Sequence, residues 1–241
     1  MKLLVFQHIE CEHPGSMRQL LSSDGIDWDV VELDAGEDIP PLEDYDALWV
    51  MGGPMDVWEV EKHPWLVAEK AAIRTWVREM KKPYLGLCLG HQLLADALGG
   101  ICGPQRPREI GILDIELTHE GQMDSLFADL PLRQKCLQWH SVQVVTPPID
   151  TTILAKSIAC PVQAMRVDRC AWSMQYHVEV ESDTVANWAD IPAYHDALID
   201  TLGSEGFALM AEGVKEHLGD FERYAGTIYR NFMSAATKTD S

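Results

Sequence analysis

Short apolar runs alternate with amphipathic stretches along the first part of the chain. Continuous apolar runs of about four to eight residues are typical of buried parallel strands, and they lie at Leu3–Phe6, Ala47–Met51 and Tyr84–Leu87. Trp28–Leu33, with Asp29 and Glu32 among its apolar residues, is predicted to be a further strand. Apolar residues at helical spacing predict helices between them, over Met17–Ser23, roughly Trp65–Met80, and His91–Leu98. This alternation predicts an α/β fold: an open, mostly parallel twisted sheet with helices on both faces.

The pattern changes after Gly99-Gly100. Strand-like segments follow without a long helix between them, and we expect some of them to be antiparallel: Ile110–Leu117, Cys136–Val145, Ile153–Lys156 and Ala171–Val180. From Ser182, which suits an N-cap, the spacing becomes helical over Asp183–Asp190, Tyr194–Leu202, Glu205–Leu218 and a final amphipathic stretch from Phe221 to Phe232.

We therefore expect one domain over residues 1–190 and a helical extension over residues 191–241, packed on the same domain. The apolar stripe of the extension, with Met210, Val214 and Leu218, could face this domain or a partner protein, and we favour packing within the chain. The polar tail from Ala235 is expected to fray.

Charge and cysteine usage narrow the class of protein. The 241 residues carry 19 Lys plus Arg against 38 Asp plus Glu, a net charge of −19. Such an acidic chain argues against nucleic acid or an anionic membrane as the main partner, and no apolar run approaches the roughly 20 residues of a membrane span. The six cysteines include no C-x-x-C pair, which favours a reduced, cytoplasmic location.

Cys88 lies where the apolar run Tyr84–Leu87 meets the helical pattern that begins at His91, between Gly86 and Gly90. A nucleophile flanked in this way by glycines, at a strand-to-helix turn, is the pattern of a nucleophile elbow, here with sulfur in place of oxygen. The helix N-terminus favours the thiolate. The alternative is a buried core cysteine beside a tight turn; both glycines and the strand-to-helix switch favour the nucleophile.

A base and an oxyanion hole can be placed around this cysteine. His177 and Glu179 are two residues apart at the end of a predicted strand, so they share a face, and the carboxylate can orient the ring. Gly53, within Gly52-Gly53-Pro54, directly follows another strand. The N–H groups of Gly53 and of Leu89 could therefore hold an oxyanion at the carboxyl edge of the sheet.

Three segments in this order, GGP at 52–54, GLCLGHQ at 86–92 and QYHVE at 175–179, resemble the class I, triad-type glutamine amidotransferases, in particular stand-alone proteins related to the glutaminase domain of GMP synthase. The resemblance covers roughly residues 3 to 190 and implies a flavodoxin-like fold. It implies Cys88 as nucleophile, His177 as base, Glu179 as its orienter, and Gly53 and Leu89 as the oxyanion hole. It further implies substrate contacts from Gln92, His140 and Ser141, and a structural role for His91.

One residue departs from the family pattern. Val178 stands between His177 and Glu179, where the family usually has proline. The two-residue spacing survives, so we expect the triad to survive, but the N–H of Val178 needs a partner that proline would not. We expect no metal site: the cluster Cys11, Glu12 and His13 offers only two good ligands close together.

Three function classes remain open at this point. The first is a glutamine amidotransferase that forms a γ-glutamyl thioester on Cys88 and passes ammonia to an acceptor or to a separate ATP-dependent synthetase subunit. The second is a stand-alone hydrolase or peptidase acting on a γ-glutamyl compound. The third is a non-catalytic binding module, which the intact Cys88, His177 and Glu179 count against. The chain has neither an S-G-G-x-D-S loop nor G-x-x-x-x-G-K-[ST], so we predict no cofactor and no synthesis of GMP by this chain alone.

Overall fold

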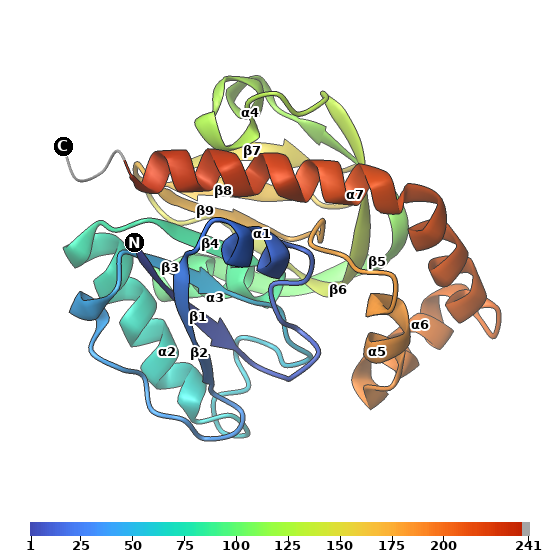
Figure 1. The fold of residues 1–241 in the computed structure, drawn as a ribbon. Helices are drawn as coiled ribbons and strands as arrows, with labels where there is room; N and C mark the ends of the chain where they lie inside the picture. Colours follow the sequence, from blue (N-terminus) through green and yellow to red (C-terminus); the bar gives the residue numbers. More distant parts are fainter. Residues whose placement is uncertain (238–241) are drawn as a thin grey trace.

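A computed structural model describes residues 1–237 of the chain, and a single mixed sheet forms its centre (Figure 1). The strands are β1 Lys2–Gln7, β2 Asp27–Glu32, β3 Ala47–Val50, β4 Tyr84–Leu87, β5 Ile101–Leu117, β6 Arg133–Thr146, β7 Thr151–Lys156, β8 Ala164–Val167 and β9 Ala171–Met174. The helices are α1 Met17–Ser23, α2 Trp65–Arg74, α3 Leu89–Ala97, α4 His119–Met123, α5 Thr184–Ala189, α6 Pro192–Leu202 and α7 Gly206–Ala236. A π-helical segment, Thr75–Met80, continues α2, and short 3-10 turns lie at Leu42–Asp44 and Ser125–Phe127.

The sheet is parallel in one half and antiparallel in the other. Its strand order within the described residues is β2-β1-β3-β4-β9-β8-β7-β5-β6. Strands β2, β1, β3, β4 and β9 pair in parallel, whereas β8, β7, β5 and β6 pair with their neighbours antiparallel. The predicted α/β class is confirmed, and the antiparallel part is larger than the sequence pattern indicated.

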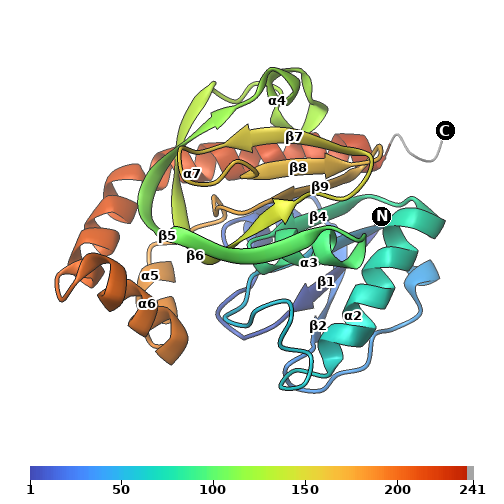
Figure 2. The same cartoon turned by 180° about the vertical axis from the view of Figure 1, so that it is seen from behind.

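Helices cover both faces of the parallel half because its strands are apolar on both sides. Leu3 and Val5 of β1 pack in one core with α1 and with the second half of α7. Leu4 and Phe6 of the same strand point the other way, into a core formed with α2 and α3. Figures 1 and 2 show α7 and α2 on opposite sides of the sheet. A fully buried side chain of this size contributes about 1.5–3 kcal/mol, which fixes the carboxyl ends of β1, β3 and β4 beside one another.

The extension forms a third core at one end of the sheet. Trp139 and Leu137 of β6 pack with Trp188 of α5, Tyr194 of α6 and the first half of α7. The two helices predicted over 205–218 and 221–232 are one continuous helix of 31 residues. Its apolar stripe faces this core and the sheet. The division near residue 190 stays a prediction.

Several element boundaries differ from the sequence-based expectation. Strand β9 ends at Met174 instead of Val180, and β8, which the pattern did not predict, forms an antiparallel pair with it. The N-cap of α5 is Asp183, without a side-chain hydrogen bond, so the expectation for Ser182 was wrong. The tail from Ala235 begins inside α7, and its residues 238–241 lie outside the described residues. Across residues 1–237, no helix combines the length and apolar character needed to span a membrane.

Candidate active site

Cys88 forms a strained turn between β4 and α3. Its backbone has φ +52° and ψ −102°, a conformation that costs about 1–3 kcal/mol for a residue with a side chain. The Cys88 N–H donates to Met174 O at 2.8 Å, and the Gly90 N–H donates to Met51 O at 3.1 Å. These bonds to the ends of β9 and β3 hold the turn in place, with Cys88 only 5% exposed.

Glycine is required on the helical side of this turn. A Cβ atom added at Gly90 would lie 2.1 Å from the carbonyl oxygen of Val50, and one at Gly86 would lie 2.6 Å from the carbonyl oxygen of Gly90. Neither contact can be relieved by moving a side chain, since both involve backbone atoms. The glycine spacing in the sequence therefore reflects close packing of the elbow against β3 and against itself.

His177 and Glu179 meet as the spacing predicted, although not on a regular strand. His177 makes only an isolated bridge to Leu137 of β6. Its Nδ1 lies 2.5 Å from Oε1 of Glu179, and both side chains are buried. The Val178 N–H donates to Oε2 of the same Glu179 at 2.9 Å. Val178, unlike proline, has a backbone N–H, and this N–H is satisfied by the Glu179 carboxylate. The bond also helps to orient that carboxylate toward His177.

The charge of Glu179 changes the proton affinity of the imidazole. Burial alone would lower the pKa of His177, but the Glu179 carboxylate and the nearby Cys88 thiol raise this pKa well above its ordinary value. The pKa of Glu179 is lowered in turn, because the charge and hydrogen bond of His177 outweigh its own burial. The pair therefore favours an imidazolium facing a carboxylate.

The second ring nitrogen of His177 is the one available to the thiol. Nε2 is buried without a partner at ordinary hydrogen-bond geometry, while Cys88 is close enough to raise the pKa of the ring. A loose contact of this kind is common before substrate binds. Gln175 also reaches the sulfur, with its Nε2 3.7 Å from Sγ of Cys88.

The two residues predicted to supply the oxyanion donors are neighbours. A Cβ atom built on Gly53 would be 2.9 Å from Cδ2 of Leu89, so these residues are in contact. Within residues 1–237, neither the Gly53 N–H nor the Leu89 N–H is hydrogen-bonded to a protein acceptor. Leu89 is also the first residue of α3, where backbone N–H groups point out of the helix and the dipole favours negative charge.

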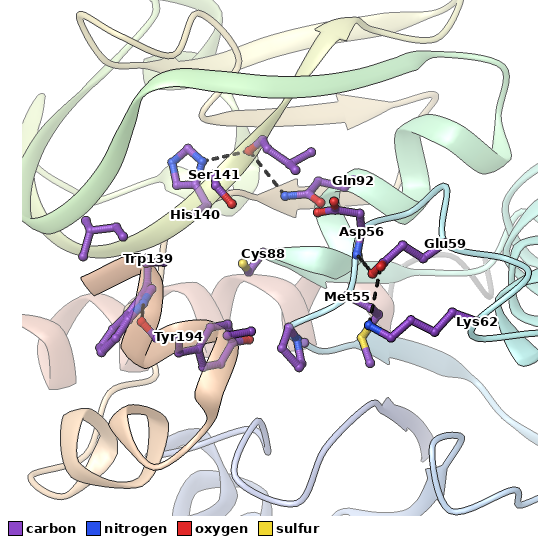
Figure 3. Close-up of a pocket in the computed structure, with 16 residues that line it drawn as sticks. Met55, Asp56, Glu59, Lys62, Cys88, Gln92, Trp139, His140, Ser141 and Tyr194 are labelled. Atoms are coloured by element: carbon purple, nitrogen blue, oxygen red, sulfur yellow. Dashed lines mark hydrogen bonds and ion pairs between the residues drawn. The ribbon is translucent and has the colours of Figure 1, made fainter. Parts of the chain in front are cut away.

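A cavity of about 280 Å³ opens over Cys88. Figure 3 shows Cys88 between Trp139 and Tyr194 on one side and Asp56 and Lys62 on the other. The three predicted substrate contacts all line this cavity: Gln92, His140 and Ser141.

Gln92 and His140 are already held by other protein groups. The Gln92 amide donates to Gln175 Oε1 at 3.2 Å. His140 Nδ1 lies 2.8 Å from Val142 O, and its Nε2 lies 3.3 Å from Oε2 of Glu109. His91 is fully buried beside Ser173, with burial lowering its pKa to about 3, which fits the structural role implied for it.

The helices after the last strand supply side chains that the sequence did not predict. The Trp188 ring packs edge-on against His177, with ring centroids 4.6 Å apart. Tyr194 donates its hydroxyl to the buried Glu12 carboxyl, whose pKa is raised mainly by burial. No spacing rule joins residues so far apart in the chain, so only the folded structure could identify them.

Glu12 is therefore engaged within the protein by the Tyr194 hydroxyl. Its neighbours in the loop after β1 are also engaged: Cys11 O accepts from the Trp188 indole at 3.2 Å, and His13 Nδ1 accepts from the Gly15 N–H at 3.1 Å. In the described part of the chain, no three His, Cys, Asp or Glu side chains gather in a way that could hold a metal ion.

Comparison with known proteins identifies the class. A family model described as "Glutamine amidotransferase class-I" matches residues 14–187. That span contains the elbow, the Gly52-Gly53 loop and the His177–Glu179 pair, and it exceeds half of the chain. The chain belongs to the class I glutamine amidotransferases.

Individual relatives place it within that class. It is 31% identical over 204 residues to a protein named GMP synthase [glutamine-hydrolyzing] from Aeropyrum pernix, and it spans 37% of that relative's length. It is 30% identical over 155 residues, 77% of the relative's length, to a GMP synthase [glutamine-hydrolyzing] subunit from Sulfolobus acidocaldarius. A solved glutamine amidotransferase from Thermotoga maritima shares 26% identity with a TM-score of 0.85, covering 96% of this chain and 97% of the other.

Proposed function

We propose that this protein hydrolyses the side-chain amide of glutamine through a γ-glutamyl thioester on Cys88 and passes the ammonia to an acceptor. One observation carries the proposal: the Cys88 thiol, which is close enough to a buried His177–Glu179 pair to raise the pKa of His177, lines one cavity with Gly53, and the N–H groups of Gly53 and Leu89 have no protein acceptor within residues 1–237. Family membership supports the same reaction class. Each of these groups has a role in acyl transfer from an amide.

In the first half of the reaction, the Cys88 thiolate attacks the side-chain carbonyl carbon of glutamine. The carbonyl oxygen becomes an oxyanion, held by the N–H groups of Gly53 and Leu89. The imidazolium of His177 gives its proton to the departing nitrogen as the C–N bond breaks. Ammonia leaves, and the thioester remains on Cys88 with His177 neutral.

In the second half, His177 takes a proton from water while the water oxygen attacks the thioester carbon. The same two N–H groups hold the second oxyanion, and the C–S bond breaks as it collapses. Glutamate leaves, Cys88 returns as thiolate, and His177 is again imidazolium. Glu179 keeps the ring oriented throughout and stabilises its charged form. The new carboxyl group gives its proton to ammonia, so the overall balance is glutamine plus water to glutamate plus ammonium.

Gln92, His140 and Ser141 are proposed to contact the glutamine. All three line the cavity over Cys88, as Figure 3 shows. Since His140 and Gln92 are fixed by neighbouring groups, they present a rigid wall, which suits a small substrate that must be placed accurately against the thiol.

The acceptor is proposed to lie outside this chain. The sequence carries no phosphate-binding loop of the kinds that ATP-dependent synthetases use. Some of its relatives are named as single subunits of a glutamine-hydrolysing GMP synthase. A separate ATP-dependent synthetase subunit is therefore the partner that we propose for ammonia transfer. The six cysteines are free thiols in the structure, which supports our placement of the protein in the cytoplasm.

A γ-glutamyl hydrolase is the second candidate, and a specific feature favours it. A hollow of about 730 Å³ adjoins the cavity over Cys88 and shares Asp56, Ser141 and Val142 with it. Trp58 and Arg106 also line this hollow. Ammonia needs no such space, whereas a γ-glutamyl compound with a larger amine would fill it.

A substrate panel separates these functions. Ammonia release from glutamine is compared with amine release from γ-glutamyl amides of increasing size, and Cys88→Ala provides the blank. Faster turnover of glutamine supports the amidotransferase, and faster turnover of a larger amide supports the hydrolase. No turnover of any member above the blank contradicts both and leaves a non-catalytic module.

A further inference from the structure

His8 is a buried histidine that the reaction described above does not use. It follows β1 directly and is only 1% exposed. Strands β1 and β3 are neighbours, with Phe6 opposite Val50. His8 and Gly52 lie two residues beyond that pair, so the register of the sheet brings the imidazole to the loop that carries Gly53.

Both ring nitrogens of His8 face acceptors. Nδ1 lies 2.8 Å from the carbonyl oxygen of Gly52, and Nε2 lies 2.8 Å from Oε1 of Glu69 on α2. A carbonyl oxygen only accepts hydrogen bonds, so Nδ1 must carry a proton, and facing an ionised Glu69 carboxylate Nε2 must carry one as well. The ring is then an imidazolium, paired with a carboxylate that is itself fully buried.

The surroundings favour that charged form. The Trp65 ring lies over the imidazole at 5.5 Å and 16° between planes, a geometry suited to a cation. Burial would lower the pKa of His8, but the charge and hydrogen bond of Glu69, the Gly52 carbonyl and the charge of Glu12 together raise it. Oε2 of Glu69 has no hydrogen-bond partner within the described residues. The bond from His8 to Oε1 is therefore what compensates the burial of this carboxylate.

The bond to Gly52 fixes the direction of the neighbouring N–H. The Gly52 carbonyl and the Gly53 N–H belong to one planar trans peptide and point in opposite directions. Because both residues of this peptide are glycines, the peptide plane can rotate more freely than a peptide between residues with side chains. A donor on the carbonyl side therefore holds the Gly53 N–H on the side opposite His8, and Gly53 lines the cavity over Cys88.

We propose that His8 is a positioning residue: clamped by Glu69, it holds the Gly52–Gly53 peptide so that the Gly53 N–H stays in the oxyanion hole. This rests on the proposed function of Gly53. His8 itself touches neither the substrate nor the reacting atoms, and its action passes through the peptide.

Two isosteric substitutions separate positioning from simple structural support. In His8→Asn the side-chain amide replaces Nδ1 and keeps the donor to Gly52, while Glu69 loses its partner. In His8→Gln the amide replaces Nε2 and keeps the donor to Glu69, while Gly52 loses its partner. The buried carboxylate makes His8→Asn the less stable variant, yet the proposal makes it the more active one.

We expect His8→Gln to lower kcat for glutamine hydrolysis by about 10- to 100-fold, with little change in KM, since one oxyanion donor is misplaced. His8→Asn, measured alone and with Glu69→Gln to remove the unpaired charge, should keep kcat within about fivefold of the wild type. Alkylation of Cys88 by iodoacetamide, which forms no oxyanion, should proceed at the wild-type rate in all three. His63→Gln, which removes a ring that contacts the same Trp65 but not Gly52, is the matched control.

If kcat followed stability, so that His8→Gln were both more stable and more active than His8→Asn, the proposal would be overturned. Wild-type kcat in His8→Gln would overturn it as well. An independent measurement covers the case in which the wild type hydrolyses no glutamine and the proposed function itself fails. Nitrogen NMR of ring-labelled histidine, assigned with His8→Gln, should show both His8 ring nitrogens protonated at about pH 7, where an unperturbed ring is mostly neutral. An unprotonated Nδ1 there contradicts the clamp, because the Gly52 carbonyl then has no donor.

Discussion

The hydroxyl of Tyr194 on α6 donates to the carboxyl of Glu12, 182 residues earlier in the chain. Trp139 of β6 also holds Tyr194 in place, since its indole N–H donates to Tyr194 O at 3.3 Å. The helical extension is thereby fastened to the loop after β1, and its side chains form one wall of the cavity over Cys88. Residues beyond the span matched by the family model thus shape the candidate site.

Removing the Tyr194 hydroxyl should make the α6 wall of the cavity more mobile while leaving its aromatic ring in place. We expect Tyr194→Phe to lower the free energy of unfolding by about 1–3 kcal/mol, because a buried carboxyl loses its donor. KM for glutamine should rise several-fold, since α6 is held less firmly, while the aromatic ring still fills its place. Urea denaturation and steady-state kinetics measure the two effects.

Tyr229→Phe is the matched control for this substitution. Tyr229 of α7 donates to Asp24 at 2.9 Å, outside the cavity. It should lose less stability, because Asp24 is exposed and water can replace the lost donor, and it should keep the wild-type KM. A Tyr194→Phe protein with wild-type stability would contradict the fastening role of the bond to Glu12.

The His177–Glu179 pair should make stability depend on pH in a defined direction. The pKa of His177 is raised in the folded protein, so its contribution is complete below the unfolded value of about 6.5 and is lost as pH rises through the folded value. The pKa of Glu179 is lowered, so its contribution is complete above about 4.3–4.5 and is lost as pH falls through its folded value. Both contributions are complete between these two limits.

We therefore expect the stability difference between the wild type and Glu179→Gln to be largest at about pH 5–6 and to shrink as the solution becomes alkaline. Urea unfolding across a pH series measures it. The same variant should lose about 10²–10⁴-fold in kcat, because the imidazolium is no longer oriented or stabilised. A stability difference that stays constant with pH would contradict the ion pair.

Two glycine substitutions should have opposite effects. Gly90→Ala places a methyl group against the Val50 carbonyl, so we expect a loss of more than about 3 kcal/mol and of activity. Gly219→Ala lies on the exposed face of α7 with no atom within 4 Å of the added Cβ, and it should stabilise the protein by about 0.5–1 kcal/mol. Thermal unfolding of both compares them, and a Gly90→Ala protein as stable as wild type would contradict the close packing of the elbow.

Local patterns in the sequence predicted the parallel half of the fold well. The apolar runs that became β1, β3 and β4 were short and continuous. The glycines around Cys88 marked the elbow because backbone contacts there exclude any side chain. The two-residue spacing of His177 and Glu179 was enough to predict that the two side chains meet.

Long-range contacts escaped prediction for a physical reason. The bonds of Tyr194 to Glu12 and of His8 to Gly52 join segments that only the completed sheet brings together. The single helix α7 was divided in the prediction because polar residues and Gly219 interrupt its apolar stripe, yet two different cores pack against its two halves. Tertiary packing decided these features, and local propensity did not.

Chemical trapping of Cys88 tests the central claim most directly. The protein is incubated with 6-diazo-5-oxo-norleucine, a reactive glutamine analogue, and the modified residue is located by peptide mass spectrometry in the wild type and in Cys88→Ala. We predict one adduct, on Cys88, with a parallel loss of ammonia release from glutamine. An adduct on another cysteine, no adduct at all, or ammonia release retained by Cys88→Ala would contradict the account.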